Sequence, residues 1–174
     1  MAKVVCVLAG LLFFSFVAST VAVEVSEAAA KIPVRLRVAE SGEWALYSMT
    51  GGAEQRQTIT QVREKDGDRL FTVLFELVIN GETVQSREEE WSLRNAIRDQ
   101  EELPADTRIV GIESGQEKFG GRELSTVTVD MMMFDDTIHT VFSETIPVTG
   151  VLRVEVNGGE ILNLVDFGGS IAAP

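Results

Sequence analysis

Cysteine and histidine are almost absent from this chain. Its 174 residues include one cysteine and one histidine, and the cysteine, Cys6, lies in an apolar N-terminal run. The rest of the chain has no thiol, which excludes disulfides, thiol redox chemistry and cysteine-ligated metals there. A single histidine, His139, is too few for an ordinary zinc site. We therefore expect no metal, no cofactor and a core that is stable without cross-links.

Positive charge is also scarce. Lys and Arg total 15 against 27 Asp and Glu, which gives a net charge of -12 and a pI near 4.5. Such a polyanion repels phosphate backbones and anionic membrane surfaces, so we expect no nucleic-acid partner. The acid excess favours solubility. With 45% hydrophobic residues the chain can still bury the core of a single domain.

Catalytic motifs are missing as well. A nucleophilic triad would need His139 beside an acid and a nucleophile, but Ser143 lies further along the same expected strand, too far for direct contact. No nucleophile elbow occurs, and the Gly-rich turns lack the strand–loop–helix context of a phosphate site. We predict that the protein is not an enzyme. A hydrolase centred on His139 is the least favoured alternative.

What the chain does have is an export pattern. "MAK" precedes the apolar run "VVCVLAGLLFFSFV", and "ASTVAVEVSE" follows with small residues and then acid. This is the layout of a secretory signal, which predicts a signal peptide over residues 1–22 with cleavage after Ala22, or after Ser19 as a second option. An uncleaved membrane anchor is the alternative, because Val4–Val23 is uncharged and long enough to span a bilayer. Either way we expect a periplasmic or secreted protein.

Turn residues then recur at short intervals. Gly-Gly, Asp-Gly and Asn-Gly pairs punctuate the chain, and these pairs favour tight hairpins because they tolerate positive φ. Segments rich in Val, Thr, Ile and Phe lie between them. They predict strands near 34–39, 43–49, 55–64, 69–79, 83–92, 108–113, 115–119, 122–133, 137–144, 150–156 and 160–167. The expected fold is mostly β, a curved antiparallel meander or half-open barrel with one or two short helices. We expect a linker at 23–32, one β-rich domain at 33–168 and a tail at 169–174.

One segment breaks the strand pattern. "SLRNAIRDQEELPADT" covers residues 92–107, with Ser92 as a helix cap and Pro104 as the stop. It is the best helix candidate after the signal, and an irregular crossing is the alternative. Gly51-Gly52 and Gly120-Gly121 also occupy equivalent points in two halves of similar rhythm. That repetition is consistent either with an internal duplication or with the spacing of meanders.

A strongly apolar stretch after the signal is "RLFTVLFELVI", residues 69–79. A helix would give it an apolar stripe, but its short length, the bracketing turns and the β-branched and aromatic residues favour a strand. Its two faces would then both be largely apolar, which predicts a central strand covered on both sides. The next segment, 83–92, carries Glu88-Glu89-Glu90 and reads as a solvated edge strand.

A second apolar patch lies in "STVTVDMMMF" and "TIHTVFSE", near residues 125–144. Methionine suits adaptable apolar surfaces. Ordinary core is one interpretation of these side chains, and a concave surface that holds an acyl chain or apolar peptide is the sharper one. The candidate ligand-binding residues are Phe71, Phe75, Leu77, Met131, Met133 and Phe142.

Two stretches carry a family resemblance. "GEWALYSMTGG" at 42–52 and "FSETIPVTGVLRVEVNGGEILNLVDFG" at 142–168 resemble exported bacterial domains with the curved sheet of the LolA/LolB lipoprotein carriers. The resemblance implies a half-open barrel with a helical plug over an apolar cavity. It covers the rhythm of most of 33–168 and assigns no carrier residue by position. We predict a non-enzymatic envelope protein that binds a lipid or an acylated partner; a structural or protein-interaction module is the alternative.

Overall fold

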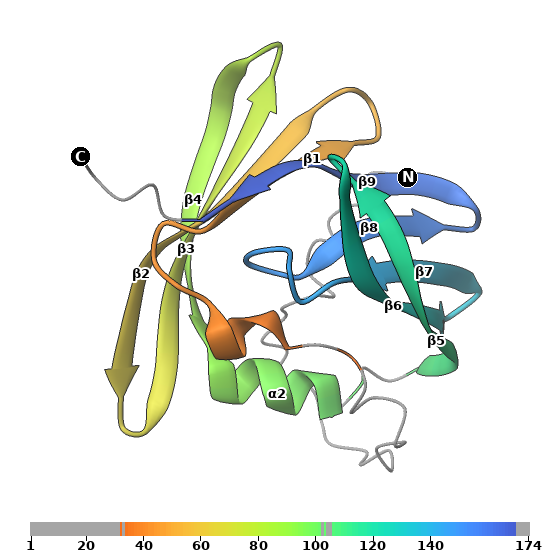
Figure 1. Cartoon of the computed structure of the whole chain (residues 1–174), viewed down its shortest axis with the longest axis horizontal. Helices are drawn as coiled ribbons and strands as arrows, with labels where there is room; N and C mark the ends of the chain where they lie inside the picture. Colours follow the sequence, from red (N-terminus) through yellow and green to blue (C-terminus); the bar gives the residue numbers. More distant parts are fainter. Residues whose placement is uncertain (1–31, 33, 102, 104–105, 170–174) are drawn as a thin grey trace.

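The computed structural model describes residues 32, 34–101, 103 and 106–169. The predicted signal, nearly all of the linker and Pro104 lie outside the described residues. Nine strands of the described residues form one antiparallel sheet, with a 3-10 helix before the first strand and an α-helix between the fourth and fifth strands in the sequence (Figure 1). The elements are η2 (Arg35–Val38), β1 (Trp44–Met49), β2 (Glu54–Lys65), β3 (Asp68–Ile79), β4 (Glu82–Ser92), α2 (Leu93–Glu101), β5 (Thr107–Phe119), β6 (Arg122–Met133), β7 (Asp136–Phe142), β8 (Val151–Val156) and β9 (Gly159–Gly168).

Strands that are consecutive in the chain are neighbours in the sheet, except that β1 pairs with β9 and β4 does not pair with β5. From edge to edge the strands run β5, β6, β7, β8, β9, β1, β2, β3 and β4. The first strand therefore pairs with the last, and the two edges belong to consecutive strands, β4 and β5. The segment containing α2 connects these edges. The sheet is open, and the predicted mostly β, half-open architecture is confirmed.

The sheet curves around three segments: η2, α2 and the loop between β7 and β8 (Figure 1). We call the face turned toward them the concave face. Strand alternation decides which side chains it carries: in β3, Phe71, Val73 and Phe75 are buried, and register places Gln57 and then Ala45 beside Phe75.

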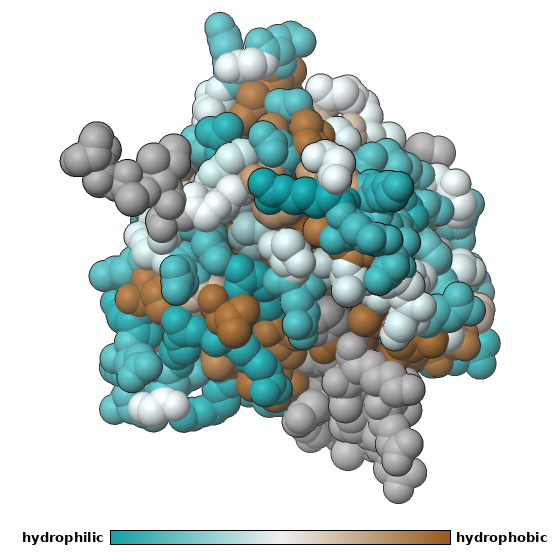
Figure 2. Space-filling view, viewed as in Figure 1, coloured by the Kyte–Doolittle hydropathy of each residue, from teal (hydrophilic) through white to brown (hydrophobic). Residues whose placement is uncertain are grey.

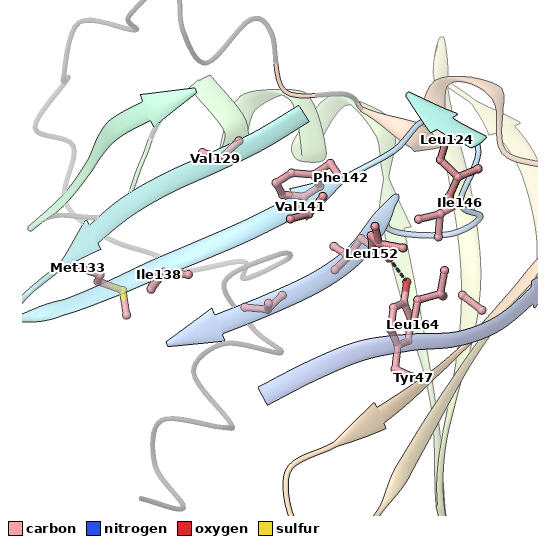
Figure 3. Close-up of a cluster of buried hydrophobic side chains, with 13 residues drawn as sticks. Tyr47, Leu124, Val129, Met133, Ile138, Val141, Phe142, Ile146, Leu152 and Leu164 are labelled. Carbon is pink, nitrogen blue, oxygen red and sulfur yellow. Dashed lines mark hydrogen bonds between the residues drawn. The ribbon is translucent and has the colours of Figure 1, made fainter. Parts of the chain in front are cut away.

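Buried apolar side chains form two clusters. The β2–β4 cluster consists of Leu36, Ala39, Ile59, Phe71, Val73, Phe75, Trp91 and Val148. The β6–β9 cluster (Figure 3) consists of Ala45, Tyr47, Leu124, Val129, Met133, Ile138, Val141, Phe142, Ile146, Val151, Leu152, Val154 and Leu164. Each half of the sheet thus has a core of its own, and β1 and β9 join the halves.

Three sequence predictions need correction. Residues 35–38 form a 3-10 helix instead of a strand. The next strand, β1, already pairs with β2 and β9 on its two sides, so this segment cannot pair with it, and the Arg37 N–H donates locally to the Val34 carbonyl. The strands expected at 108–113 and 115–119 are one strand, β5, because Gly115 continues the pairing with Thr126. The helix expected over 92–107 is confirmed only over Leu93–Glu101.

The apolar strand β3 also differs from expectation. It lies second from an edge and not at the centre, and its buried side chains, Phe71, Val73 and Phe75, all lie on the concave face. On the other face Leu70, Leu74 and Val78 are half-buried. Leu74 is flanked there by Thr58 and Glu88, so polar neighbours with aliphatic stems shield it without a second layer. The solvated edge strand expected at 83–92 is confirmed by β4.

On the surface, exposed apolar side chains are scattered. Figure 2 shows apolar groups within the upper projection, where Figure 1 places the β3–β4 hairpin. Ile79 and Val84 of this hairpin are 42% and 55% exposed. Within the described part of the chain, no helix has the length and apolarity needed to cross a membrane.

Candidate functional site

The predicted ligand-binding residues divide between the two clusters. Phe71 and Phe75 belong to the β2–β4 cluster, and Met133 and Phe142 belong to the β6–β9 cluster. Met131 is partly buried against the latter. Leu77 is half-buried on β3 and is a member of neither cluster. The six residues therefore do not form one continuous surface.

The loop between β7 and β8 contributes a buried side chain to each of the two clusters. The central loop, residues 143–150, leaves β7 and returns to β8 after projecting toward the opposite half of the sheet (Figure 1). Ile146 of this loop belongs to the β6–β9 cluster and Val148 to the β2–β4 cluster, and both side chains are fully buried. The loop therefore packs an apolar side chain against each half of the concave face.

The backbone of the central loop is strained at Val148. Its φ of 63° lies in the left-handed region, which β-branched residues avoid because their Cβ substituents crowd the backbone. Conformations of this kind cost about 1–3 kcal/mol and persist only where packing enforces them. Gly150 also has a positive φ, and a Cβ there would lie 3.3 Å from the Ser143 carbonyl oxygen and 3.4 Å from Arg35 Cβ. The loop is held in a costly conformation by its surroundings.

Tyr47 of β1 anchors the base of this loop. Its hydroxyl donates to the Val151 carbonyl at 3.1 Å (Figure 3) and lies 3.0 Å from Thr149 Oγ1. The ring is fully buried. Burial raises the pKa of the Tyr47 phenol, although the hydrogen bond to Thr149 acts in the opposite direction. The phenol therefore stays neutral and keeps its proton for the Val151 carbonyl.

A buried ion pair lies next to Gly150 of the same loop. Arg35 Nη2 of η2 is 2.5 Å from Glu43 Oε1, and the two side chains are only 9% and 12% exposed. Neither partner is fully satisfied: Arg35 Nε and Nη1 and Glu43 Oε2 have no hydrogen-bond partner. Gln57, 5% exposed, donates to Gln55 but leaves its own Oε1 unpaired. Unpaired buried polar atoms usually mark a place that water or a ligand completes.

Sequence reasoning missed this polar group. Arg35 and Arg37 have the same local setting, yet Arg35 is buried in an ion pair while Arg37 is exposed. Only the tertiary contact with Glu43 separates them, and no local pattern in the sequence encodes that contact.

Helix α2 covers the end of the β2–β4 cluster. Leu93 and Ala96 pack against the cluster, and Trp91, just before the helix, has its ring 5.4 Å from that of Phe75. The helix begins as predicted, because Ser92 Oγ accepts the Asn95 amide at 3.1 Å. Asp68 of β3 adds a second cap, with Oδ1 accepting the Arg94 amide at 3.0 Å. Hydrogen bonding from Ser92 is the main cause of the lowered pKa of Asp68.

His139 is half-exposed and belongs to neither apolar cluster. Its Nδ1 lies 2.7 Å from Asp130 Oδ1 of the neighbouring strand, and Glu155 is its register partner on β8. Among the described residues, no hydrogen bond joins His139 to Ser143, whose hydroxyl instead accepts the Thr145 amide. The contact between His139 and Asp130 is a cross-strand hydrogen bond.

Groups of three or more metal-binding side chains are not found in the described part of the chain. The candidate site is therefore the concave face, comprising the central loop, its Tyr47 anchor and the Arg35–Glu43 pair. In comparisons with known proteins, no family model matches the chain, and no curated protein matches it significantly.

Proposed function

We propose that this protein is an exported, non-enzymatic binding protein that holds an apolar ligand, an acyl chain, on the concave face of its sheet. One observation carries the proposal: the central loop places Ile146 in one apolar cluster and the strained Val148 in the other. A segment of the chain thus occupies the space where a ligand would touch both clusters. The ligand enters by displacing this loop.

The energies of such an exchange are balanced. Burial of each of these two side chains is worth about 1.5–3 kcal/mol, and each buried methylene of a ligand contributes about 0.8 kcal/mol. Roughly four to eight methylenes would replace what the loop gives up. Release of the Val148 conformation returns a further 1–3 kcal/mol or so. An acyl chain of ordinary length therefore suffices.

The test is native mass spectrometry of the protein purified gently from a bacterial envelope, with and without organic extraction. We expect an added mass of a few hundred daltons that extraction removes. After extraction, acyl probes should bind again. Ile146→Ala should raise their affinity because it weakens the loop, whereas Ile138→Ala, which removes the same atoms from the cluster outside the loop, should not. A protein that is bare when isolated and takes up no acyl probe would refute the proposal.

A second candidate function is partner binding through the edge strand β5. Among the described strands none pairs with its outer edge, and Val110, which lies at a register shift between Ile109 and Gly111, is 52% exposed. Such an edge can accept a strand from an envelope protein. Val110→Pro would remove an amide from this edge. Chemical crosslinking in the envelope should then lose a partner band that the parent protein shows, and absence of any band in the parent would exclude this function.

A further inference from the structure

The buried ion pair of Arg35 and Glu43 is incomplete. Arg35 has two unpaired N–H-bearing nitrogens, Nε and Nη1, and Glu43 has one unpaired oxygen, Oε2. A buried pair offsets its desolvation only when its remaining hydrogen-bonding capacity is also used. As it stands the pair is a poor contributor to stability, so its placement needs another explanation.

The pair borders the site of the proposed ligand. Arg35 Cβ lies 3.4 Å from the position of a Cβ on Gly150, so η2 touches the end of the central loop. The Glu43 carbonyl accepts the Ile59 amide at 2.8 Å, which places Glu43 diagonally across from Gln57 on the same face. Gln57 is in turn the register partner of Phe75. Polar atoms without partners therefore lie beside the apolar β2–β4 cluster.

The unpaired atoms define the chemistry that would complete them. Arg35 Nε and Nη1 need acceptors, while Glu43 Oε2 and Gln57 Oε1 need donors. Arg35 and Glu43 already neutralise each other, so an anionic headgroup would leave a net negative charge buried beside Glu43. The net charge of -12 on the chain opposes anions further. A neutral headgroup with ester oxygens and hydroxyls meets all of these demands.

Resting on the proposed function, we propose that Arg35, Glu43 and Gln57 form a headgroup subsite, and that the ligand is an acyl chain carrying a neutral, hydroxyl-bearing ester, as in a monoacylglycerol. Arg35 N–H groups donate to the ester and hydroxyl oxygens. Glu43 and Gln57 accept from the hydroxyls. The acyl chain then takes the place of the central loop against the β2–β4 cluster.

The experiment is a competition among three probes with the same chain length: 1-monooleoylglycerol, oleate and 1-octadecene. The delipidated protein is offered all three in equal amounts, and native mass spectrometry reads which is retained. We expect 1-monooleoylglycerol to be favoured by about tenfold or more, since one or more hydrogen bonds to a charged partner separate it from the hydrocarbon.

A double variant localises the preference. Arg35→Met with Glu43→Leu replaces the pair by apolar side chains, and we expect it to fold and to bind 1-octadecene while losing the preference for the glycerol ester. The matched control is Arg63→Met with Glu90→Leu, the same change at an ion pair whose side chains are 47% and 52% exposed. The control should keep the preference.

The other possible results refute different parts of the proposal. Equal retention of all three probes, or an unchanged preference in the Arg35/Glu43 variant, would refute the headgroup subsite while the proposed function stands. Preferred retention of oleate would refute a neutral headgroup. Retention of no probe by the parent protein would refute the proposed function itself.

Discussion

The Tyr47 hydroxyl and Thr149 Oγ1 lie 3.0 Å apart although 102 residues separate them in the sequence. Tyr47 belongs to β1, the strand that joins the two halves of the sheet, and Thr149 belongs to the central loop. This contact fixes the loop to β1, which lies between β2 and β9 in the sheet. The loop is therefore bound by a polar contact to β1, where the two halves of the sheet meet, and by apolar contacts to the cluster in each half. We call the pairing of β1 with β9 the β1–β9 seam.

Removal of that anchor should loosen the loop more than the sheet. Tyr47→Phe deletes the hydroxyl and leaves Thr149 Oγ1 and the Val151 carbonyl without it, at a cost of about 1–3 kcal/mol in the free energy of unfolding. Amide hydrogen exchange should accelerate over residues 143–150, while β3 stays protected. Thr149→Val and the double variant complete a cycle, and additive effects of the two changes would show that the contact carries no coupling.

Because Val148 has a strained backbone, we expect replacement by glycine to be tolerated at least as well as replacement by alanine, which reverses the usual order of stability for a buried strand or loop valine. Val148→Ala loses roughly 1.6 kcal/mol of burial for two methylene equivalents and keeps the unfavourable φ of 63°. Val148→Gly loses slightly more burial but relieves about 1–3 kcal/mol of backbone strain. We expect the glycine variant to be at least as stable as the alanine variant in chemical denaturation.

Val154 supplies the control for this order. It is equally a buried valine, 3% exposed, but it lies in β8 and does not have a positive φ. There glycine should be less stable than alanine by about 0.5–1 kcal/mol because of its greater chain entropy. The same order at both positions would mean that Val148 is not strained.

Much of the sheet could be predicted from local signals, because hairpins are encoded locally. Asp66-Gly67 and Asn80-Gly81 adopt positive φ at the turns where the sequence required it. Between them the alternation of Phe71, Val73 and Phe75 fixed the face that is buried. The open, mostly antiparallel architecture follows from a series of such hairpins.

The site could not be predicted in the same way, because its contacts are non-local. The pairing of β1 with β9 joins the two halves of the sheet, although these strands are far apart in the sequence. No turn motif in the sequence predicts this pairing. The loop at 143–150 looks like any Pro- and Gly-containing connection, yet it is buried between the clusters. The Phe and Met residues chosen from the sequence are mostly buried as expected of apolar strands, but which loop touches them depends on that closure.

The cap formed by Asp68 predicts acid-dependent stability. Hydrogen bonds from Ser92 and the Arg94 amide favour the carboxylate, so the pKa of Asp68 in the folded protein is lowered below its unfolded value of about 3.9. Its contribution is therefore present above about pH 4 and is lost as the pH falls through the lowered pKa. Asp68→Asn keeps an oxygen that can accept a hydrogen bond but removes the negative charge at the N-terminus of α2, so it should destabilise the protein at neutral pH by about 0.3–1 kcal/mol.

The measurement is urea unfolding of both proteins as a function of pH. The difference between parent and Asp68→Asn should narrow as the pH falls below about 4, because the parent carboxylate then takes up a proton. Asp135→Asn, a change at an exposed turn, should leave the curve unchanged. A constant difference at all pH values would show that the Asp68 charge plays no part in capping α2.

At the β1–β9 seam, Gly168 lies directly against the Trp44 indole. A Cβ on Gly168 would lie 2.8 Å from Trp44 Nε1 and 3.0 Å from its Cε2, so the indole, whose ring centroid lies 5.5 Å from the Arg56 guanidinium, must move. We expect Gly168→Ala to cost about 1–3 kcal/mol, as overpacking does, and to shift Trp44 fluorescence when Trp91 is replaced by Phe in both proteins. Gly169→Ala is the matched control, since a Cβ there meets nothing within 4 Å. If both alanines are equally harmless, Trp44 does not pack on the last strand, and the joint between the two halves is looser than this contact requires.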